Sequence, residues 1–188
     1  MTATVPALPV GIDPADPGSK FTMTDGVRAV VSAEAPVHIG VLHQRLGDAW
    51  NIERIGSDIR GNIDAAIRLA GVIRDGDFLT LAGMPHPAVR TPTEACERTV
   101  EQVHERELAL ALAGLVRDAG GIGRGELITR AARLYGWSRP GPDVTDRMAA
   151  VISELRRDGI LAGDEHTVTA AADGRRPGVR DPARPARP

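Results

Sequence analysis

The chain has 188 residues, a formal net charge of −2 and a single cysteine. A nearly neutral chain does not coat nucleic acid by charge alone, and one cysteine excludes both a disulfide framework and a cysteine-ligated zinc site. Aromatic residues make up only 3% of the chain, so its core must be built from Leu, Ile, Val and Ala. This composition favours a mainly helical protein with one large or two small domains.

The sequence predicts a protein without a membrane segment. No apolar run approaches the roughly 18 residues that cross a bilayer. The first residues, from Met1 to Pro6, lack the basic start and apolar core of a signal peptide. Arginine, alanine, glycine and proline are abundant and Lys20 is the only lysine, a bias typical of GC-rich genomes. We therefore expect a cytoplasmic bacterial protein.

The first predicted unit spans residues 24–82 and follows a lead-in, residues 1–23, that holds four prolines and is expected to be disordered. Thr24 or Asp25 can cap a helix that ends at Ala35 and Pro36, and a second apolar helical pattern ends at Trp50. Three further segments are predicted: a short extended piece at 37–39, a third helix from Ser57 to Gly71, and a hairpin over 72–81 with a tight turn at Asp75-Gly76.

Residues 83–104 contain Pro85, Pro87 and Pro92 and predict a stiff linker with the start of a connecting helix near Glu94. Residues 105–170 repeat the pattern of the first unit, with a third helix about three residues longer, and a hairpin built from Ile160-Leu161 and 167–169. Residues 171–188 are rich in Pro, Arg, Ala and Gly and are expected to form a disordered basic tail.

The two units share matched residues at one spacing, which predicts an internal repeat. Each has an aromatic residue, a loop arginine, a turn glycine and a carboxylate in the same order: Trp50, Arg54, Gly56 and Asp58, then Tyr135, Arg139, Gly141 and Asp143. The order helix, strand, helix, helix, hairpin is that of a winged helix. The predicted fold is therefore mainly α with small β-hairpins (α+β class), arranged as two tandem winged-helix (helix-turn-helix) units.

In such a fold the start of the third helix contacts DNA. The candidate contacts in the first unit are Arg54, Ser57, Arg60, Asn62 and the wing residue Arg74; in the second they are Arg139, Thr145 and Arg147. Four carboxylates at the same helix starts oppose phosphates: Asp58, Asp64, Asp143 and Asp146. Arg54 and Arg139 could instead pair with these carboxylates. The sequence leaves DNA contact open against a local structural role or protein contact.

The sequence contains no pattern of catalysis or of cofactor binding. The glycine-rich stretch 120–126 follows a helix and lacks a phosphate-binding lysine motif. The five histidines are scattered without a metal-ligand spacing, and Cys96 has no evident acid or base partner. We therefore expect no enzyme activity, no cofactor and no metal.

Residues 27–81 resemble a known family. The residues that carry the likeness are Glu34 to His38, Leu42 to Leu46, Trp50, Arg54 to Ser57, Ile59-Arg60 and Asp75 to Leu79, and residues 120–161 resemble the second half of the same region. This region is similar to a domain of unknown function near the C-terminus of large bacterial proteins that resemble superfamily 1 DNA/RNA helicases, often with a restriction-endonuclease-like nuclease region. The family carries a basic residue where this chain has Asp58.

The resemblance implies an accessory module and transfers no catalytic residues. One hypothesis is a non-catalytic tandem winged-helix module that binds DNA beside a helicase or nuclease. The alternative is a protein-interaction adaptor that docks on such a helicase or nuclease partner. The sequence does not give the oligomeric state, the DNA site or the identity of the partner.

Overall fold

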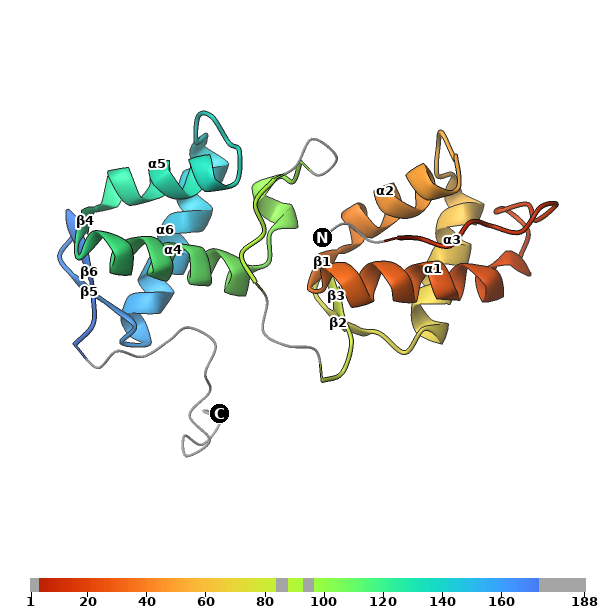
Figure 1. Ribbon diagram of the computed structural model, residues 1–188, viewed down its shortest axis with the longest axis horizontal. Helices are drawn as coiled ribbons and strands as arrows, with labels where there is room; N and C mark the ends of the chain where they lie inside the picture. The colour runs from red at the N-terminus through yellow and green to blue at the C-terminus, as the bar shows by residue number, and fades with distance from the viewer. Residues whose placement is uncertain (1–3, 84–87, 93–96, 173–188) are drawn as a thin grey trace. The chain divides into compact units, whose positions relative to one another are not determined.

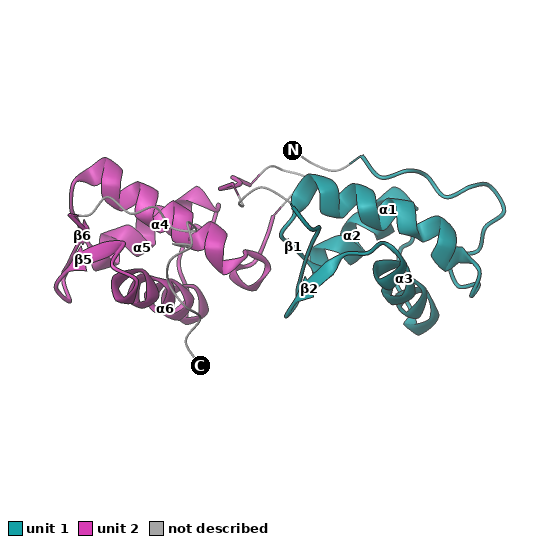
Figure 2. Cartoon of the chain, turned by 90° about the horizontal axis from the view of Figure 1, so that it is seen from below, with its two compact units in different colours: residues 1–85 teal, residues 86–188 magenta. Residues whose placement is uncertain are grey.

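The computed structural model describes residues 4–83, 88–92 and 97–172 and divides the chain into two compact units, residues 1–85 and 86–188 (Figure 2). The described residues form six α-helices, one short 3-10 helix and two three-stranded antiparallel sheets. This composition confirms the predicted α+β class.

Both units have the same order of elements (Figure 1). Unit 1 consists of α1 (Ser19–Glu34), β1 (Val37–His38), α2 (Ile39–Ala49), α3 (Ser57–Leu69), β2 (Ile73–Asp75) and β3 (Phe78–Thr80). Unit 2 consists of the 3-10 helix η1 (Val100–Gln102), α4 (Glu105–Ala119), β4 (Ile122–Gly123), α5 (Arg124–Leu134), α6 (Pro142–Arg157), β5 (Leu161–Gly163) and β6 (Thr167–Ala170).

The two sheets have the same topology. Their strand orders are β1-β3-β2 and β4-β6-β5, so the short strand after the first helix pairs with the last strand of the hairpin. The register places Val37 opposite Leu79 and Ile122 opposite Val168. All four side chains are buried. The hairpin is thereby joined to the helices by backbone pairing as well as by apolar contact.

Each unit has its own apolar core of aliphatic residues, as the scarcity of aromatics predicts. The largest fully buried apolar side chains in unit 1 are Met23, Leu42, Leu46, Ile63 and Leu79. Those in unit 2 are Leu108, Leu112, Leu127, Met148 and Ile152. The third helix and the hairpin complete each core. They contribute Ile63 and Leu79 in unit 1 and Met148 and Val168 in unit 2.

Residues with a positive φ follow the second and third helices in both units. The residue after the aromatic end of the second helix has a positive φ: 54° at Asn51 and 77° at Gly136. The third helix is followed by a glycine at φ 70° in each unit, Gly71 and Gly159. These left-handed residues turn the chain sharply after each helix. Helix α6 has 16 residues against 13 in α3, as expected.

Two helices are capped by histidine rather than by a hydroxyl or carboxylate. The Nδ1 atom of His38 accepts a hydrogen bond from the backbone N–H of Gly40 at 3.0 Å. The Nδ1 atom of His104 accepts one from Arg106 at 3.1 Å. Both imidazoles therefore satisfy a backbone donor that the first helical turn leaves without a partner.

The first helix begins at Ser19 rather than at Thr24, and the expectation of a disordered lead-in is wrong for residues 4–18. Thr24 lies inside the helix and its hydroxyl donates to the carbonyl of Lys20 at 2.9 Å. The hydroxyl of Ser19 donates to the carbonyl of Pro14, and Val5 and Leu8 pack against the core of unit 1. Proline content alone indicated disorder, but the apolar residues between the prolines have a surface to cover.

The first hairpin turns one residue later than predicted. Asp75 pairs with Phe78, so the turn residues are Gly76 and Asp77, and Gly76 takes the positive φ of 58°. In the second hairpin, β5 and β6 extend to Gly163 and Ala170. The carbonyl of Asp77 accepts a hydrogen bond from Ile39, which fixes this register against the start of α2.

From residue 88 on, the described part of the predicted linker belongs to unit 2. Pro92 lies against Gly136, where an added Cβ atom would come within 2.9 Å of the proline ring. Residues 100–102 form the short 3-10 helix η1, and α4 begins only at Glu105. Residues 97–104 therefore contain no connecting helix longer than η1. Pro85, Pro87, Glu94 and the tail from residue 173 lie outside the described residues.

Candidate functional site

The candidate functional surface of unit 1 consists of the turn between α2 and α3 and the first turns of α3. The backbone N–H of Ile52 donates to the carbonyl of Gly47 at 2.9 Å, which closes the end of α2. The chain then crosses to α3 with Arg54, Ser57 and Arg60 exposed. The hydroxyl of Ser57 donates to Asp58 at 3.3 Å.

The two exposed arginines of this surface have no hydrogen bond or ion pair with any described residue. The alternative that Arg54 pairs with Asp58, and Arg139 with Asp143 in unit 2, is not observed among the described residues. By contrast, Arg45 of unit 1 is buried and its Nε lies 3.1 Å from the buried carboxylate of Glu34. The buried Arg45 is thus paired, whereas Arg54 and Arg60 at the turn are exposed.

Asn62 is not available to a nucleic acid. It is 9% exposed, and its side-chain nitrogen donates to the carbonyls of Pro14 and Asp16 at 2.9 and 2.8 Å. The same nitrogen lies 3.2 Å from the hydroxyl of Ser19. Its predicted place among the DNA contacts is therefore wrong, because the amide anchors the lead-in to α3.

Arg74 lies in the first hairpin and is exposed. Its Nε donates to the carbonyl of Gly76 at 2.8 Å, and its Nη2 lies 3.5 Å from Asp77. This exposed pair within the turn contributes little to stability. The guanidinium is thus folded over its own turn, yet remains within reach of solvent.

In unit 2 the corresponding surface is less basic. Arg139 is exposed, but Thr145 and Arg147 are half-buried. Arg147 occupies the place that Asn62 has in unit 1, and its Nε is buried without a hydrogen-bond partner in the described structure. Asp143 and Asp146 are exposed at the same helix start. The candidate residues of unit 2 therefore do not form one basic surface.

His43 lies at the junction of α2 and α3 and adds no charge to it. Burial lowers the pKa of His43; Asp64 opposes this shift, and Arg60 and His38 add to it. Its Nε2 is buried without a hydrogen-bond partner among the described atoms. The lowered pKa favours the neutral form of this imidazole.

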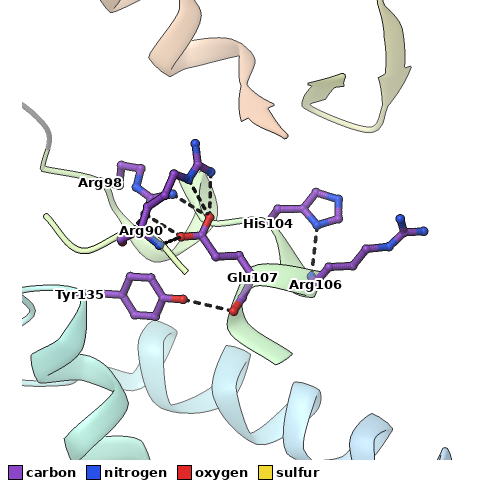
Figure 3. Close-up of polar contacts among 6 residues, drawn as sticks. All are labelled: Arg90, Arg98, His104, Arg106, Glu107 and Tyr135. Carbon is purple, nitrogen blue, oxygen red and sulfur yellow. Dashed lines mark hydrogen bonds and ion pairs between the residues drawn. The ribbon is translucent and has the colours of Figure 1, made fainter. Parts of the chain in front are cut away.

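Another group of charged side chains surrounds the buried Glu107 of α4 (Figure 3). The Glu107 side chain is fully buried, and its carboxylate lies 2.7 Å from Nη2 of Arg90 and 2.9 Å from Nη2 of Arg98. The backbone N–H of Arg90 also donates to it at 2.9 Å. The Tyr135 hydroxyl donates to the backbone carbonyl of Glu107 at 3.3 Å.

This cluster binds the segment before α4 to the helices. Burial alone would raise the pKa of Glu107, but hydrogen bonds from Arg98 and Arg90 and their charges outweigh burial, so the pKa is lowered. Burial raises the pKa of Tyr135, and the charge of Glu107 adds to the shift. Both shifts favour an ionised carboxylate and a neutral phenol near neutral pH.

The aromatic residues at the ends of α2 and α5 are anchors. Tyr135 is buried and stacks on Trp137, with ring centroids 5.0 Å apart. The indole N–H of Trp137 donates to the carbonyl of Arg98 at 2.7 Å, and that of Trp50 donates to the carbonyl of Pro6 at 2.9 Å. In both units an aromatic side chain thus holds the segment that precedes the first helix.

No group of three or more metal-ligating side chains occurs within residues 4–83, 88–92 and 97–172. None of the helices in these ranges is both long and apolar enough to cross a membrane.

Residues 13–61 match the model of a family described as "Protein of unknown function (DUF3320)". The matched stretch includes the end of the lead-in, all of α1 and α2, and the first residues of α3. It supports the likeness of unit 1 to a domain of unknown function. Searches of curated proteins and of solved structures returned no match.

Proposed function

We propose that the two units are tandem winged helices and that the chain is a non-catalytic DNA-binding module. The turn between α2 and α3 takes the place of a helix-turn-helix, and the hairpin beside α3 takes the place of the wing. In that arrangement the N-terminal part of the third helix faces base edges and the flanking side chains contact phosphates.

One observation carries this proposal: the unpaired, exposed arginines at the start of α3. Arg54 and Arg60 flank the exposed hydroxyl of Ser57, and no described carboxylate neutralises either guanidinium. The only carboxylate that Arg74 pairs with among the described residues is the solvent-exposed one of Asp77, at 3.5 Å, which a phosphate displaces at little cost. These three arginines make unit 1 the principal DNA-contacting unit.

The charge balance predicts contact with few phosphates. Acidic residues outnumber basic ones within residues 4–83, so the affinity must come from local arginine–phosphate pairs rather than from net charge. Each neutralised phosphate contributes about −0.9 to the slope of log K against log salt. Three contacts therefore give a slope of roughly −3.

Fluorescence anisotropy of a labelled duplex at low and moderate salt tests the proposal. The double variant Arg54→Ala/Arg60→Ala should reduce the salt slope by about 2 and weaken binding to every duplex alike. Arg117→Ala, which removes an exposed arginine of α4, is the matched control and should leave binding unchanged. Absence of binding at micromolar protein in low salt refutes the proposal, as does an equal loss in the control.

A second function, docking on a helicase or nuclease partner, is favoured by unit 2. Asp143 and Asp146 are exposed at the start of α6, where Arg147 is half-buried. This helix start repels phosphates and suits a protein partner. The resemblance of the sequence to helicase-associated regions supports this choice of partner. Capture of the partner by the tagged chain after nuclease treatment distinguishes direct docking from bridging by DNA.

A further inference from the structure

The hairpin of unit 1 has an open edge at β2. This strand pairs with β3 alone in the described sheet, and all three of its residues are exposed. A two-residue turn is flanked by a hydrogen-bonded pair, so Asp75 and Ile73 exchange backbone hydrogen bonds with β3. The N–H and C=O of Arg74 therefore point away from β3, and those of Val72 do so by the same alternation. Such an edge is a template for pairing with another strand.

Two large apolar side chains are exposed beside this edge. Leu69 in the last turn of α3 is 45% exposed, and Ile73 in β2 is 50% exposed. They lie at the two ends of the turn that joins α3 to β2. The edge thus offers both components of strand pairing, which are outward backbone groups and apolar side chains that a second strand would cover.

The corresponding edge of unit 2 lacks these features. In the register of the two hairpins, Ala162 occupies the place of Ile73. Counted back from the glycine that follows the third helix, Arg157 stands where unit 1 has Leu69. Strand β5 also ends in Gly163, whose φ of 104° interrupts a regular strand edge. Within one chain, the same fold therefore carries one edge suited to pairing and one that is not.

We propose that two copies of the chain associate through β2, which pairs antiparallel with β2 of the second copy about a twofold axis at Ile73. This register places Arg74 opposite Val72 of the second copy, and Val72 opposite Arg74. The outward backbone groups of these residues then form four hydrogen bonds between the copies. The two Ile73 side chains lie directly opposite each other, with their Cα atoms about 4.5 Å apart.

Charge favours this register and a second copy as the occupant. An axis at Arg74 would oppose two guanidinium groups, and an axis at Asp75 would oppose two carboxylates. With the axis at Ile73, the exposed Asp75 lies opposite Gly71 of the second copy. The exposed Arg68 precedes that glycine by three residues. One end of the edge thus carries a carboxylate and the other a guanidinium, as a self-complementary antiparallel pair requires.

The association is weak and independent of the proposed DNA binding. One short strand and two aliphatic side chains from each copy form a small interface, for which a dissociation constant of about 0.1 mM is expected. The guanidinium of Arg74, assigned above to DNA, takes no part in it. The self-association can therefore be measured without DNA, and its failure would leave the DNA-binding proposal untouched.

Sedimentation equilibrium of the full chain tests the association. The average mass should rise from near the monomer value of 19.9 kDa at about 10 μM towards twice that value at about 1 mM. Ile73→Lys places two like charges opposite each other and removes the apolar contact, so it should weaken association about tenfold. Ala162→Lys makes the same change at the equivalent exposed position of unit 2, and should have no effect.

Cross-linking gives a second measurement, because Ile73→Lys could loosen the hairpin. With Cys96 changed to serine, Ile73→Cys provides the only thiol of the chain. Cα atoms about 4.5 Å apart suit a disulfide, so an oxidant such as copper phenanthroline should convert most of this variant to a covalent dimer. Arg74→Cys and Ala162→Cys in the same background should cross-link at least about fivefold more slowly, because copies of residue 74 lie two positions out of register.

Three results would overturn the proposal. The first is a mass that stays at the monomer value up to about 1 mM. The second is an equal loss of association in Ile73→Lys and Ala162→Lys, which would place the contact elsewhere. The third is cross-linking of Arg74→Cys or Ala162→Cys as fast as that of Ile73→Cys, which would show that Ile73 does not lie on the axis.

Discussion

Replacing Glu107 by glutamine should destabilise unit 2 strongly. The substitution keeps the shape of the side chain but leaves the buried guanidinium of Arg98 and the half-buried one of Arg90 without their carboxylate. Removing one partner of a buried ion pair costs about 3–5 kcal/mol. A unit of this size has a free energy of unfolding of roughly 4–12 kcal/mol, so the loss takes a large share of it. The melting temperature of unit 2 should fall by more than about 12 °C.

Hydrogen exchange in increasing urea measures this effect in each unit separately. Peptides from α4 and α5 report on unit 2, and peptides from α1 and α2 serve as the internal reference. Glu126→Gln is the matched control, because its partner Arg130 lies on the surface of α5 and such a pair contributes at most about 1 kcal/mol. A loss below about 1 kcal/mol in Glu107→Gln would refute the reasoning, since it would show that water already screens the cluster.

The difference in stability between the wild type and Glu107→Gln should depend on pH. The pKa of Glu107 is lowered in the folded chain from an ordinary value of 4.5. Its ionised form therefore contributes stability above pH 4.5, and that contribution is lost as the pH falls through the folded-state pKa. The difference in stability between wild type and Glu107→Gln should be constant near neutral pH and shrink in acid. A difference that grows in acid would contradict the assignment of Glu107 as an ionised group.

Two further changes are predicted to alter stability. Gly26→Ala should destabilise unit 1 by about 1–3 kcal/mol, because the new Cβ would lie 2.6 Å from the ring of Trp50. Gly114→Ala in α4 meets no atom within 4 Å and should stabilise unit 2 by about 0.5–1 kcal/mol. Urea denaturation measures both changes. A hydrogen bond that the protonated Glu154 donates to Glu105, together with burial, raises the pKa of Glu154. Its contribution to stability is therefore fully present below pH 4.5 and is lost as the pH rises through the folded-state pKa. Glu154→Gln should therefore raise the melting temperature slightly at pH 7 and not at pH 4, and a rise that is larger at pH 4 would contradict this.

Local patterns predicted the elements that depend on neighbours in sequence. The third helices and both hairpins follow from apolar spacing and from turn glycines such as Gly71 and Gly76, whose positive φ values any such turn requires. The three-residue extension of α6 follows from the later position of Gly159. The hairpin turn lies one residue later than predicted, because Asp75 still pairs with Phe78. The pairing of β3 with β1, which lies far away in sequence, could not be read from local patterns.

The buried polar contacts could not be predicted, because their partners are not related by any periodicity. Arg90 and Arg98 lie in a proline-containing stretch that resembles a linker, and only the fold brings them to Glu107. Asn62 was predicted to face DNA from its position in the helix, but the lead-in covers it. A glutamate at an apolar position of a helix, as at residue 107 beside Leu108, was the one available sign of a buried pair.

The segment that precedes the first helix of each unit determines where the chain can be divided. A boundary at Glu105, where α4 begins, would separate Glu107 from both arginines and leave a fully buried carboxylate unpaired. A boundary at Thr24 would cut through α1 and remove the carbonyls that Asn62 binds. Division between residues 83 and 88 keeps each segment with its own helices. The piece that can be exchanged, duplicated or grafted intact is thus the helices and hairpin together with the stretch before them.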